Sequence, residues 1–239
     1  MGVRCRLGAI RISSRGSKPC SYVEYRHTEQ NAHRHRFVSL HITRRCTELN
    51  LCAAAHKFNW QFNPKAFDRV QIEELATGDF IRRRTNLILV GWSGVGKSHI
   101  IQALGQRACV HGYRVLYRTS AELLSDLTAS LADKTLPARL RRYANPDLLV
   151  IDEFGFDRIE RTECPQAAHL LYKIIASRSQ KHSTALVTNV DFDKWGEYLS
   201  DGPLAMAFMD RLVEGAIILK VKGKSYRAPK ATGSENNPT

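Results

Sequence analysis

Several common features are missing from this sequence, and each absence removes a class of protein. The chain of 239 residues contains no apolar run of roughly 18 residues, the length that a membrane-spanning helix needs, so we expect no contact with a membrane. Its 6 cysteines include no Cys-x-x-Cys pair and are spread along a chain too long to need disulfide staples, which indicates reduced thiols and a cytoplasmic location. Hydrophobic residues make up 43% and charged residues 25%, which excludes a wholly disordered chain.

Acidic residues are scarce in the first 50 residues, which hold ten Arg or Lys and three Glu, whereas the whole chain carries +13. We expect residues 1–57 to form a basic and largely irregular, poorly ordered extension, and residues 229–239 a disordered tail. Three interpretations of the extension stay open: a nucleic-acid-binding arm, an organellar transit peptide, or sequence upstream of the functional start. A zinc site drawn from four of its residues fits no common finger spacing: His33, His35, Cys46 and Cys52.

From about residue 58, short apolar runs alternate with helical patterns. Five runs read as buried strands, at residues 87–90, 115–117, 148–151, 185–188 and 217–221. Helical periodicity follows Ser98 and Pro165. Because strands that alternate with helices are joined by right-handed crossovers, the pattern predicts an α/β fold with three layers and a mostly parallel five-stranded sheet.

The strongest chemical signal follows the first of these strands. Residues 91–98 read Gly-Trp-Ser-Gly-Val-Gly-Lys-Ser, a complete G-x-x-x-x-G-K-[ST] motif between a strand and a helix. Glycines let the backbone N–H groups of such a loop face phosphates, and the helix N-terminus adds its positive dipole end. We expect Lys97 to reach the β- and γ-phosphates of ATP and Ser98 to bind Mg²⁺, while bulky Trp92 has no assigned role. The predicted nucleotide-binding residues of the loop are Gly91, Ser93, Gly94, Val95, Gly96, Lys97 and Ser98.

Polar side chains follow two later strands. Asp152 and Glu153 close the third run, and Asn189 follows the fourth. Since ligands bind at the carboxyl edge of a parallel sheet, we expect Asp152 to bind Mg²⁺ and Glu153 to orient or deprotonate the attacking water. Asn189 is expected to hold the same water. The simpler alternatives are acids that merely face solvent and a turn-forming asparagine.

These motifs occur in an order that resembles the IstB-like ATPases of the AAA+ superfamily, whose relatives include the DnaC and DnaI helicase loaders. The resemblance covers residues 58–228, which we interpret as the ATPase domain. It depends on five segments: 91–98, 148–153, 188–189, 209–212 and 223–227. It implies a P-loop NTPase that hydrolyses ATP to ADP and phosphate with Mg²⁺.

The resemblance also assigns roles to three later residues. Asn189 matches sensor 1, Arg227 matches sensor 2, and Arg211 matches the arginine finger that reaches a neighbouring subunit's site. An arginine supplied in this way stabilises the negative charge that develops on the transferred phosphoryl group. The alternative for Arg211 is an ion pair with Asp210 or Glu214 on its own helix.

The partners that the resemblance implies are double-stranded DNA, a transposase of an insertion sequence and further copies of the chain. Candidate DNA contacts lie between residues 121 and 145, at Lys134, Arg139, Arg141 and Arg142, although a solvated helix face explains each equally well. Two other functions stay open: a replicative helicase loader, which shares these ATPase residues, and a P-loop kinase for a small molecule. The helical partner-binding segment that precedes the ATPase core in this family is not clear in residues 1–50.

Overall fold

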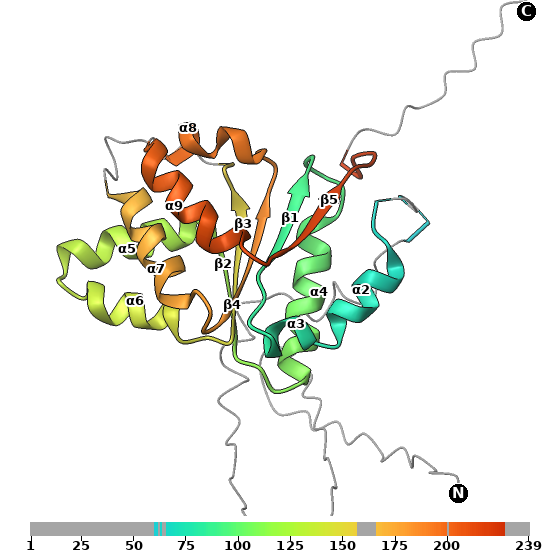
Figure 1. Ribbon diagram of the computed structural model, residues 1–239, viewed down its shortest axis with the longest axis horizontal. Helices are drawn as coiled ribbons and strands as arrows, with labels where there is room; N and C mark the ends of the chain where they lie inside the picture. Colours follow the sequence, from blue (N-terminus) through green and yellow to red (C-terminus); the bar gives the residue numbers. More distant parts are fainter. Residues whose placement is uncertain (1–59, 62, 64–65, 157–165, 200, 228–239) are drawn as a thin grey trace, which may run out of the picture. The chain divides into compact units, whose positions relative to one another are not determined.

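A single parallel sheet organises the described part of the chain, which in this computed structural model comprises residues 60–61, 63, 66–156, 166–199 and 201–227. Its strands are β1 Leu87–Gly91, β2 Val115–Thr119, β3 Leu148–Phe154, β4 Ser183–Thr188 and β5 Ile217–Val221. The spatial order is β2-β3-β4-β1-β5, and every neighbouring pair is parallel (Figure 1). The prediction of an α/β fold with a five-stranded sheet is confirmed.

Helices cover both faces of this sheet (Figure 1). One face packs against α2 Arg69–Ala76, α3 Asp79–Arg82 and α4 Lys97–Val110. The other face packs against α5 Ser120–Ala132, α6 Leu136–Ala144, α7 Ala167–Arg178, η2 Phe192–Lys194, α8 Trp195–Leu199 and α9 Gly202–Val213. The predicted three-layer arrangement is therefore also confirmed.

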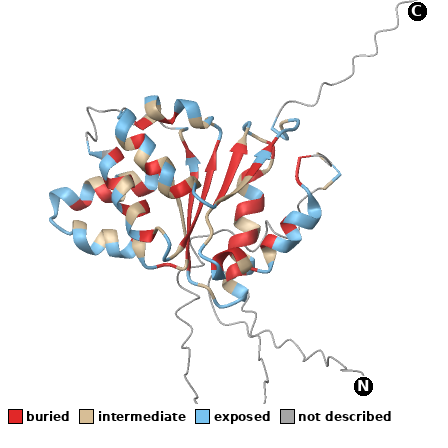
Figure 2. Cartoon of the chain, in the orientation of Figure 1, coloured by how far each residue is buried: buried red, intermediate tan, exposed pale blue. Residues whose placement is uncertain are grey.

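The three central strands β3, β4 and β1 are buried from both sides, which explains why they read as continuous apolar runs rather than as alternating ones (Figure 2). In β1, Leu87 and Leu89 belong to the core cluster beneath α4, while Ile88 and Val90 belong to the cluster on the opposite face. All four side chains are at most 5% exposed. Each such residue contributes about 1.5–3 kcal/mol of burial free energy, so the sheet is a rigid platform for whatever its carboxyl edge carries.

Strand β3 departs from the prediction at its end. The apolar pattern predicted a strand that ends in the two acids, but β3 continues one residue further, to Phe154. Its pairing with β4 shifts register between Ile151 and Phe154, and Glu153 has a φ of 59°. Phe154 is fully buried against Trp195 and Phe208, with ring centroids 5.0 and 5.6 Å away. This aromatic contact holds the irregular end of β3 in place.

Other sequence-based predictions concern residues that the structure does not describe. The basic extension up to residue 57, the tail from residue 229 and the four residues considered for zinc all lie outside the described ranges. Where the chain is described, none of its helices combines the length and apolar character that crossing a bilayer requires.

Candidate nucleotide-binding site

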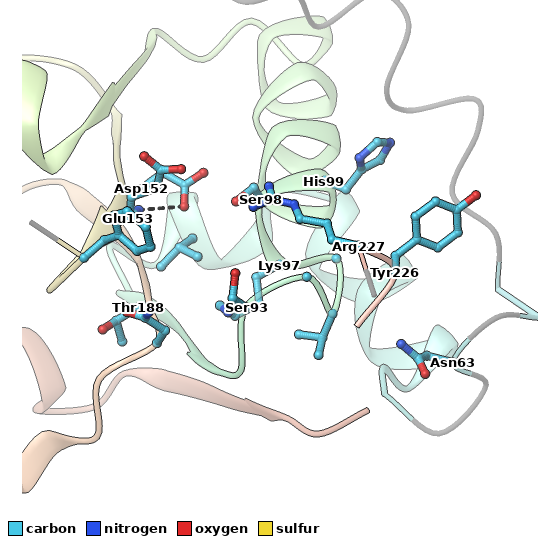
Figure 3. Close-up of a pocket in the computed structure, with 16 residues that line it drawn as sticks. Asn63, Ser93, Lys97, Ser98, His99, Asp152, Glu153, Thr188, Tyr226 and Arg227 are labelled. Carbon is cyan, nitrogen blue, oxygen red and sulfur yellow. Dashed lines mark hydrogen bonds between the residues drawn. The ribbon is translucent and has the colours of Figure 1, made fainter. Parts of the chain in front are cut away.

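A pocket of about 460 Å³ opens at the carboxyl edge of the sheet, where β1, β3 and β4 end (Figure 3). Ten of the twelve predicted site residues line it. These are Ser93, Gly94, Val95, Gly96, Lys97, Ser98, Asp152, Glu153, Asn189 and Arg227. Gly91 lies behind the loop and contributes its carbonyl to Lys97, while Arg211 does not line this pocket.

The loop between β1 and α4 has the backbone shape that the motif predicts. Gly94 and Gly96 adopt φ values of 79° and 102°, in the left-handed region that favours glycine. Helix α4 begins at Lys97, and its N-cap is Gly96, which has no side chain that could cap the first turn. The N–H groups of that turn therefore have no side-chain cap, which suits them to bind an anion.

Lys97 stabilises this loop through hydrogen bonds to its backbone. Its side chain is buried, and Nζ donates to the carbonyl oxygens of Gly91 at 2.6 Å and Trp92 at 2.8 Å. An ammonium has three donors, so one remains for a ligand in the pocket. Burial lowers the pKa of Lys97, the charge of Asp152 opposes that shift, and Arg227 adds to it. The Trp92 side chain is 78% exposed and does not line the pocket.

The irregular end of β3 brings both acids to the same pocket. Successive residues of a regular strand point to opposite faces, so Asp152 and Glu153 would normally diverge. The register shift and the left-handed φ of Glu153 let both side chains line the cavity. Asp152 is 2% exposed and its Oδ1 accepts the N–H of Glu153 at 2.8 Å (Figure 3). The interpretation that both acids simply face solvent is therefore wrong for Asp152, while Glu153 is exposed within the pocket mouth.

Thr188 fixes the neighbouring turn. Its hydroxyl donates to the carbonyl of Phe154 at 2.8 Å and accepts the N–H of Val190 at 3.0 Å. The first bond ties the end of β4 to the end of β3, and the second fixes the turn after β4. Asn189 lies between the two tied residues of this turn and lines the pocket, as predicted.

The segment that follows β5 closes another side of the pocket. The N–H of Tyr226 donates to the carbonyl of Gly94 at 2.8 Å. Asn63 makes two bonds with the main chain of Lys224, one from its Nδ2 to the carbonyl at 2.7 Å and one from the N–H to its Oδ1 at 3.0 Å. The segment therefore carries Arg227 to the pocket, beside the P-loop (Figure 3).

Arg211 lies on α9, away from this pocket. Its guanidinium stacks over the ring of Tyr172 on α7, with 5.0 Å between Cζ and the ring centroid, and Nη1 donates to the carbonyl of Ala207 at 3.4 Å. Among the described residues it forms no ion pair, so the alternative of a bond with Asp210 or Glu214 is not observed.

The basic residues nominated for DNA have mixed surroundings. Arg139 and Arg142 lie 3.1 and 3.9 Å from the carboxylate of Asp126 on α5. Lys134 and Arg141 are exposed. The positive charges of Arg139 and Arg142 are thus partly neutralised by Asp126.

Several lining residues were not predicted from the sequence. They are Asn63, His99, Phe156, Val187, Thr188 and Tyr226. Tyr226 and Thr188 are next to predicted residues in the motifs, so the sequence could have indicated that they lie near the site. Asn63 precedes the P-loop by some thirty residues in an unpatterned stretch, and no sequence signal connects it to the site.

The donors in the pocket fit a magnesium–nucleotide complex. Mg²⁺ prefers oxygen ligands and is commonly held by one or two carboxylates together with substrate phosphates. The pocket offers the Ser98 hydroxyl and the Asp152 carboxylate as oxygen donors (Figure 3). In the described ranges, no group of three or more His, Cys, Asp or Glu side chains forms a metal cluster.

Comparison with known proteins identifies a family for this chain. The family model for the IstB-like ATP binding protein matches residues 17–234. The ATP-binding protein of insertion sequence IS5376 from Geobacillus stearothermophilus is 35% identical over 170 residues, covering 71% of this chain and 66% of the relative. That of IS21 from Pseudomonas aeruginosa is 36% identical over 171 residues, covering 72% and 63%. The matches thus span about two thirds or less of these two relatives.

Solved structures confirm the fold. DnaI superposes with a TM-score of 0.57 at 19% identity, over 74% of this chain and 92% of DnaI. The DnaC helicase loader superposes with a TM-score of 0.54 at 19% identity, over 68% and 98%. The chain therefore shares the fold of these two structures. With the family model covering most of its length, this chain belongs to the family of IstB-like ATP-binding proteins.

Proposed function

We propose that this protein is a Mg²⁺-dependent ATPase that binds double-stranded DNA and assists the transposase of an insertion sequence. One observation carries the ATPase proposal. A single pocket gathers the P-loop with both acids of β3, Asn189 and Arg227. The family adds the context of insertion sequences, since the relatives are named after them.

ATP binding follows from the loop. The P-loop and the uncapped start of α4 line the pocket, and their N–H groups would bind the phosphates. Lys97 is held by two loop carbonyls and directs its remaining donor to the β- and γ-phosphates. Ser98 and Asp152 hold Mg²⁺, which neutralises charge on the phosphate oxygens when it is bound.

Hydrolysis requires an attacking water in line with the terminal phosphate. Glu153 orients this water and accepts its proton, because its carboxylate is exposed in the pocket and forms no ion pair with any described residue. Asn189 offers an amide to the same water from the tip of β4. Arg227 stabilises the negative charge that develops on the phosphoryl group.

Oligomerisation completes the site. Arg211 does not line the pocket of its own chain and is held by Tyr172 without an acidic partner in the described ranges. A guanidinium held in this way is available to a neighbouring copy, whose hydrolysis would then depend on assembly.

DNA binding is supported by charge. The chain carries a formal net charge of +13, and Lys134 and Arg141 are exposed. Each phosphate that a protein cation neutralises releases counterions, so DNA affinity should fall steeply as salt is added.

The direct test measures the ATPase rate and the particle mass together, with and without duplex DNA. We expect DNA to increase both. A rate independent of DNA and of protein concentration, with a phosphorylated small molecule as product, would instead identify a kinase. Pull-down with a transposase and with a hexameric helicase then separates a transposition helper from a helicase loader.

A further inference from the structure

A tyrosine on the neighbouring strand holds the carboxylate of Asp152. Tyr117 lies on β2, and its hydroxyl donates a hydrogen bond to Oδ2 of Asp152. Gln102 on α4 in turn donates from Nε2 to the Tyr117 hydroxyl at 3.1 Å. These bonds form a continuous chain from α4 through β2 to β3.

The sheet register explains why these side chains meet. Tyr117 pairs with Val150, so Asp152 lies two residues further along β3 and its side chain is on the same face of the sheet. That face packs against α4, where Gln102 lies four residues, about one helical turn, after Ser98. The bond chain thus connects the two elements that carry the magnesium donors.

The direction of these bonds is fixed by chemistry. The Gln102 amide nitrogen is a donor, so the tyrosine oxygen accepts it and its own proton goes to Asp152. Burial raises the pKa of Tyr117, and the charge of Asp152 adds to this shift, so the hydroxyl keeps its proton at neutral pH. Hydrogen bonds in such a chain polarise one another and strengthen the last bond.

The carboxylate is consequently oriented by one donor on each oxygen. Glu153 N–H occupies a lone pair of Oδ1, and the Tyr117 hydroxyl occupies one of Oδ2. An ionised carboxylate offers about four acceptor positions, so each oxygen keeps capacity for a cation or its water. Without the tyrosine bond, Oδ2 loses its donor and the Glu153 N–H on Oδ1 is left to orient the carboxylate.

We propose that Tyr117 is a positioning residue, which holds Asp152 in the orientation that binds Mg²⁺, with Gln102 supporting it from α4. The proposal rests on the magnesium site of the proposed function. Donors behind a ligating side chain typically contribute about 10–100-fold to metal affinity, which sets the expected size of the effect.

The test compares two Tyr→Phe variants that each delete one hydroxyl. Tyr117→Phe removes the donor to Asp152. Tyr143→Phe removes a matched donor, because the Tyr143 hydroxyl donates to Asp126 at 2.8 Å, its pKa is also raised by burial, and it does not line the pocket. The readout is the equilibrium Kd of a non-hydrolysable ATP analogue, measured once with Mg²⁺ and once with EDTA.

We expect Tyr117→Phe to weaken binding with Mg²⁺ by about tenfold and to leave binding with EDTA unchanged. Tyr143→Phe should alter neither value. Equal weakening in both buffers would assign Tyr117 a merely structural role, and wild-type affinity in both would remove it from the site. If the wild-type protein binds no nucleotide in either buffer, the proposed function itself is wrong and this inference falls with it.

A second variant allows the proposal to be tested even if Tyr117→Phe does not fold. Gln102→Leu keeps the tyrosine but removes the donor behind it, so it should lower the Mg²⁺-dependent affinity in the same direction by a smaller factor. Thermal unfolding of each variant identifies any that fails to fold. A folded Gln102→Leu protein with unchanged affinity, together with an unfolded Tyr117→Phe protein, would overturn the positioning role in favour of a structural one.

Discussion

The backbone N–H of Tyr226 donates a 2.8 Å hydrogen bond to the carbonyl of Gly94, which joins the segment after β5 to the middle of the P-loop. The fit around this bond is tight. A Cβ atom added to Gly94 would lie 2.1 Å from Oγ of Ser225. Gly94 is therefore constrained twice, by its left-handed φ of 79° and by the close approach of this segment.

A comparison of Gly94→Ala with Gly112→Ala should distinguish the effect of the left-handed φ from the effect of the close approach of Ser225. Both glycines have a positive φ, so each alanine costs about 1–2 kcal/mol of backbone strain. Nothing lies within 4 Å of a Cβ at Gly112, in the turn after α4. We expect both variants to lose thermal stability, with Gly94→Ala losing more because of the added clash. ATP affinity should fall by at least about tenfold only in Gly94→Ala, because only that change displaces the segment that carries Arg227. Equal ATP affinities in the two variants would show that the contact with Ser225 has no role in binding.

The layer structure could be predicted because the sequence signals for it are local. The five apolar runs and the motif at residues 91–98 each need only a short window, and the parallel sheet follows from their alternation with helices. The strand order could not be read in the same way, since it depends on which crossovers pass over which strands. The P-loop residues could be predicted because their motif also lies within a short window of the sequence.

The remaining parts of the site depend on contacts between distant segments. The register shift at Glu153 leaves no pattern in the sequence. The left-handed φ of Glu153 is imposed by the buried Phe154 side chain and by the hydrogen bond from Thr188 to the Phe154 carbonyl. Asn63 is joined to the site by two bonds to Lys224, 161 residues away. Tyr117 reads as an ordinary strand residue until β2 and β3 are paired.

Replacement of Glu153 by glutamine should leave ATP binding intact and stop turnover. The amide has nearly the same shape but cannot accept the proton of the attacking water, and general bases contribute about 10²–10⁴-fold to rate. ATP affinity should stay within about twofold of wild type, since Glu153 is not among the groups proposed to bind Mg²⁺ or phosphate. Single-turnover hydrolysis and analogue binding measure the two effects. Wild-type turnover would remove Glu153 from its proposed role.

Replacement of Arg211 by alanine should abolish hydrolysis without affecting nucleotide binding, because this side chain does not line its own pocket. Mixing this variant with Lys97→Ala should restore part of the activity, since a P-loop from one copy then meets an arginine from the other. Tyr172→Leu keeps the guanidinium but removes the ring on which it stacks, so an intermediate rate is expected. Failure of the mixture to recover any activity would exclude an arginine that acts between copies.

Arg178 should be among the most important residues for stability, although it lies at the amino edge of the sheet, opposite the pocket. Its side chain is 1% exposed. The guanidinium Nη1 donates to the carbonyls of Tyr143, Ala144 and Pro146 at 2.8, 3.0 and 2.9 Å. It also donates to Ser183 and Thr184 at the start of β4. One side chain thus satisfies carbonyls at the end of α6 and joins them to the sheet.

Replacement of Arg178 by methionine would leave these buried carbonyls without donors, at a cost of about 3 kcal/mol in the free energy of unfolding. Arg178→Lys should lose less, because an ammonium retains three of the five donors of a guanidinium. Arg107→Met, at an exposed position on α4, is the control and should change stability by no more than about 0.5 kcal/mol. Burial lowers the pKa of Arg178 to about 9, which measures the desolvation that its hydrogen bonds must offset. If urea denaturation gave Arg178→Met the stability of Arg107→Met, the carbonyls of α6 would have to find other donors, and this arginine would not hold the helix to the sheet.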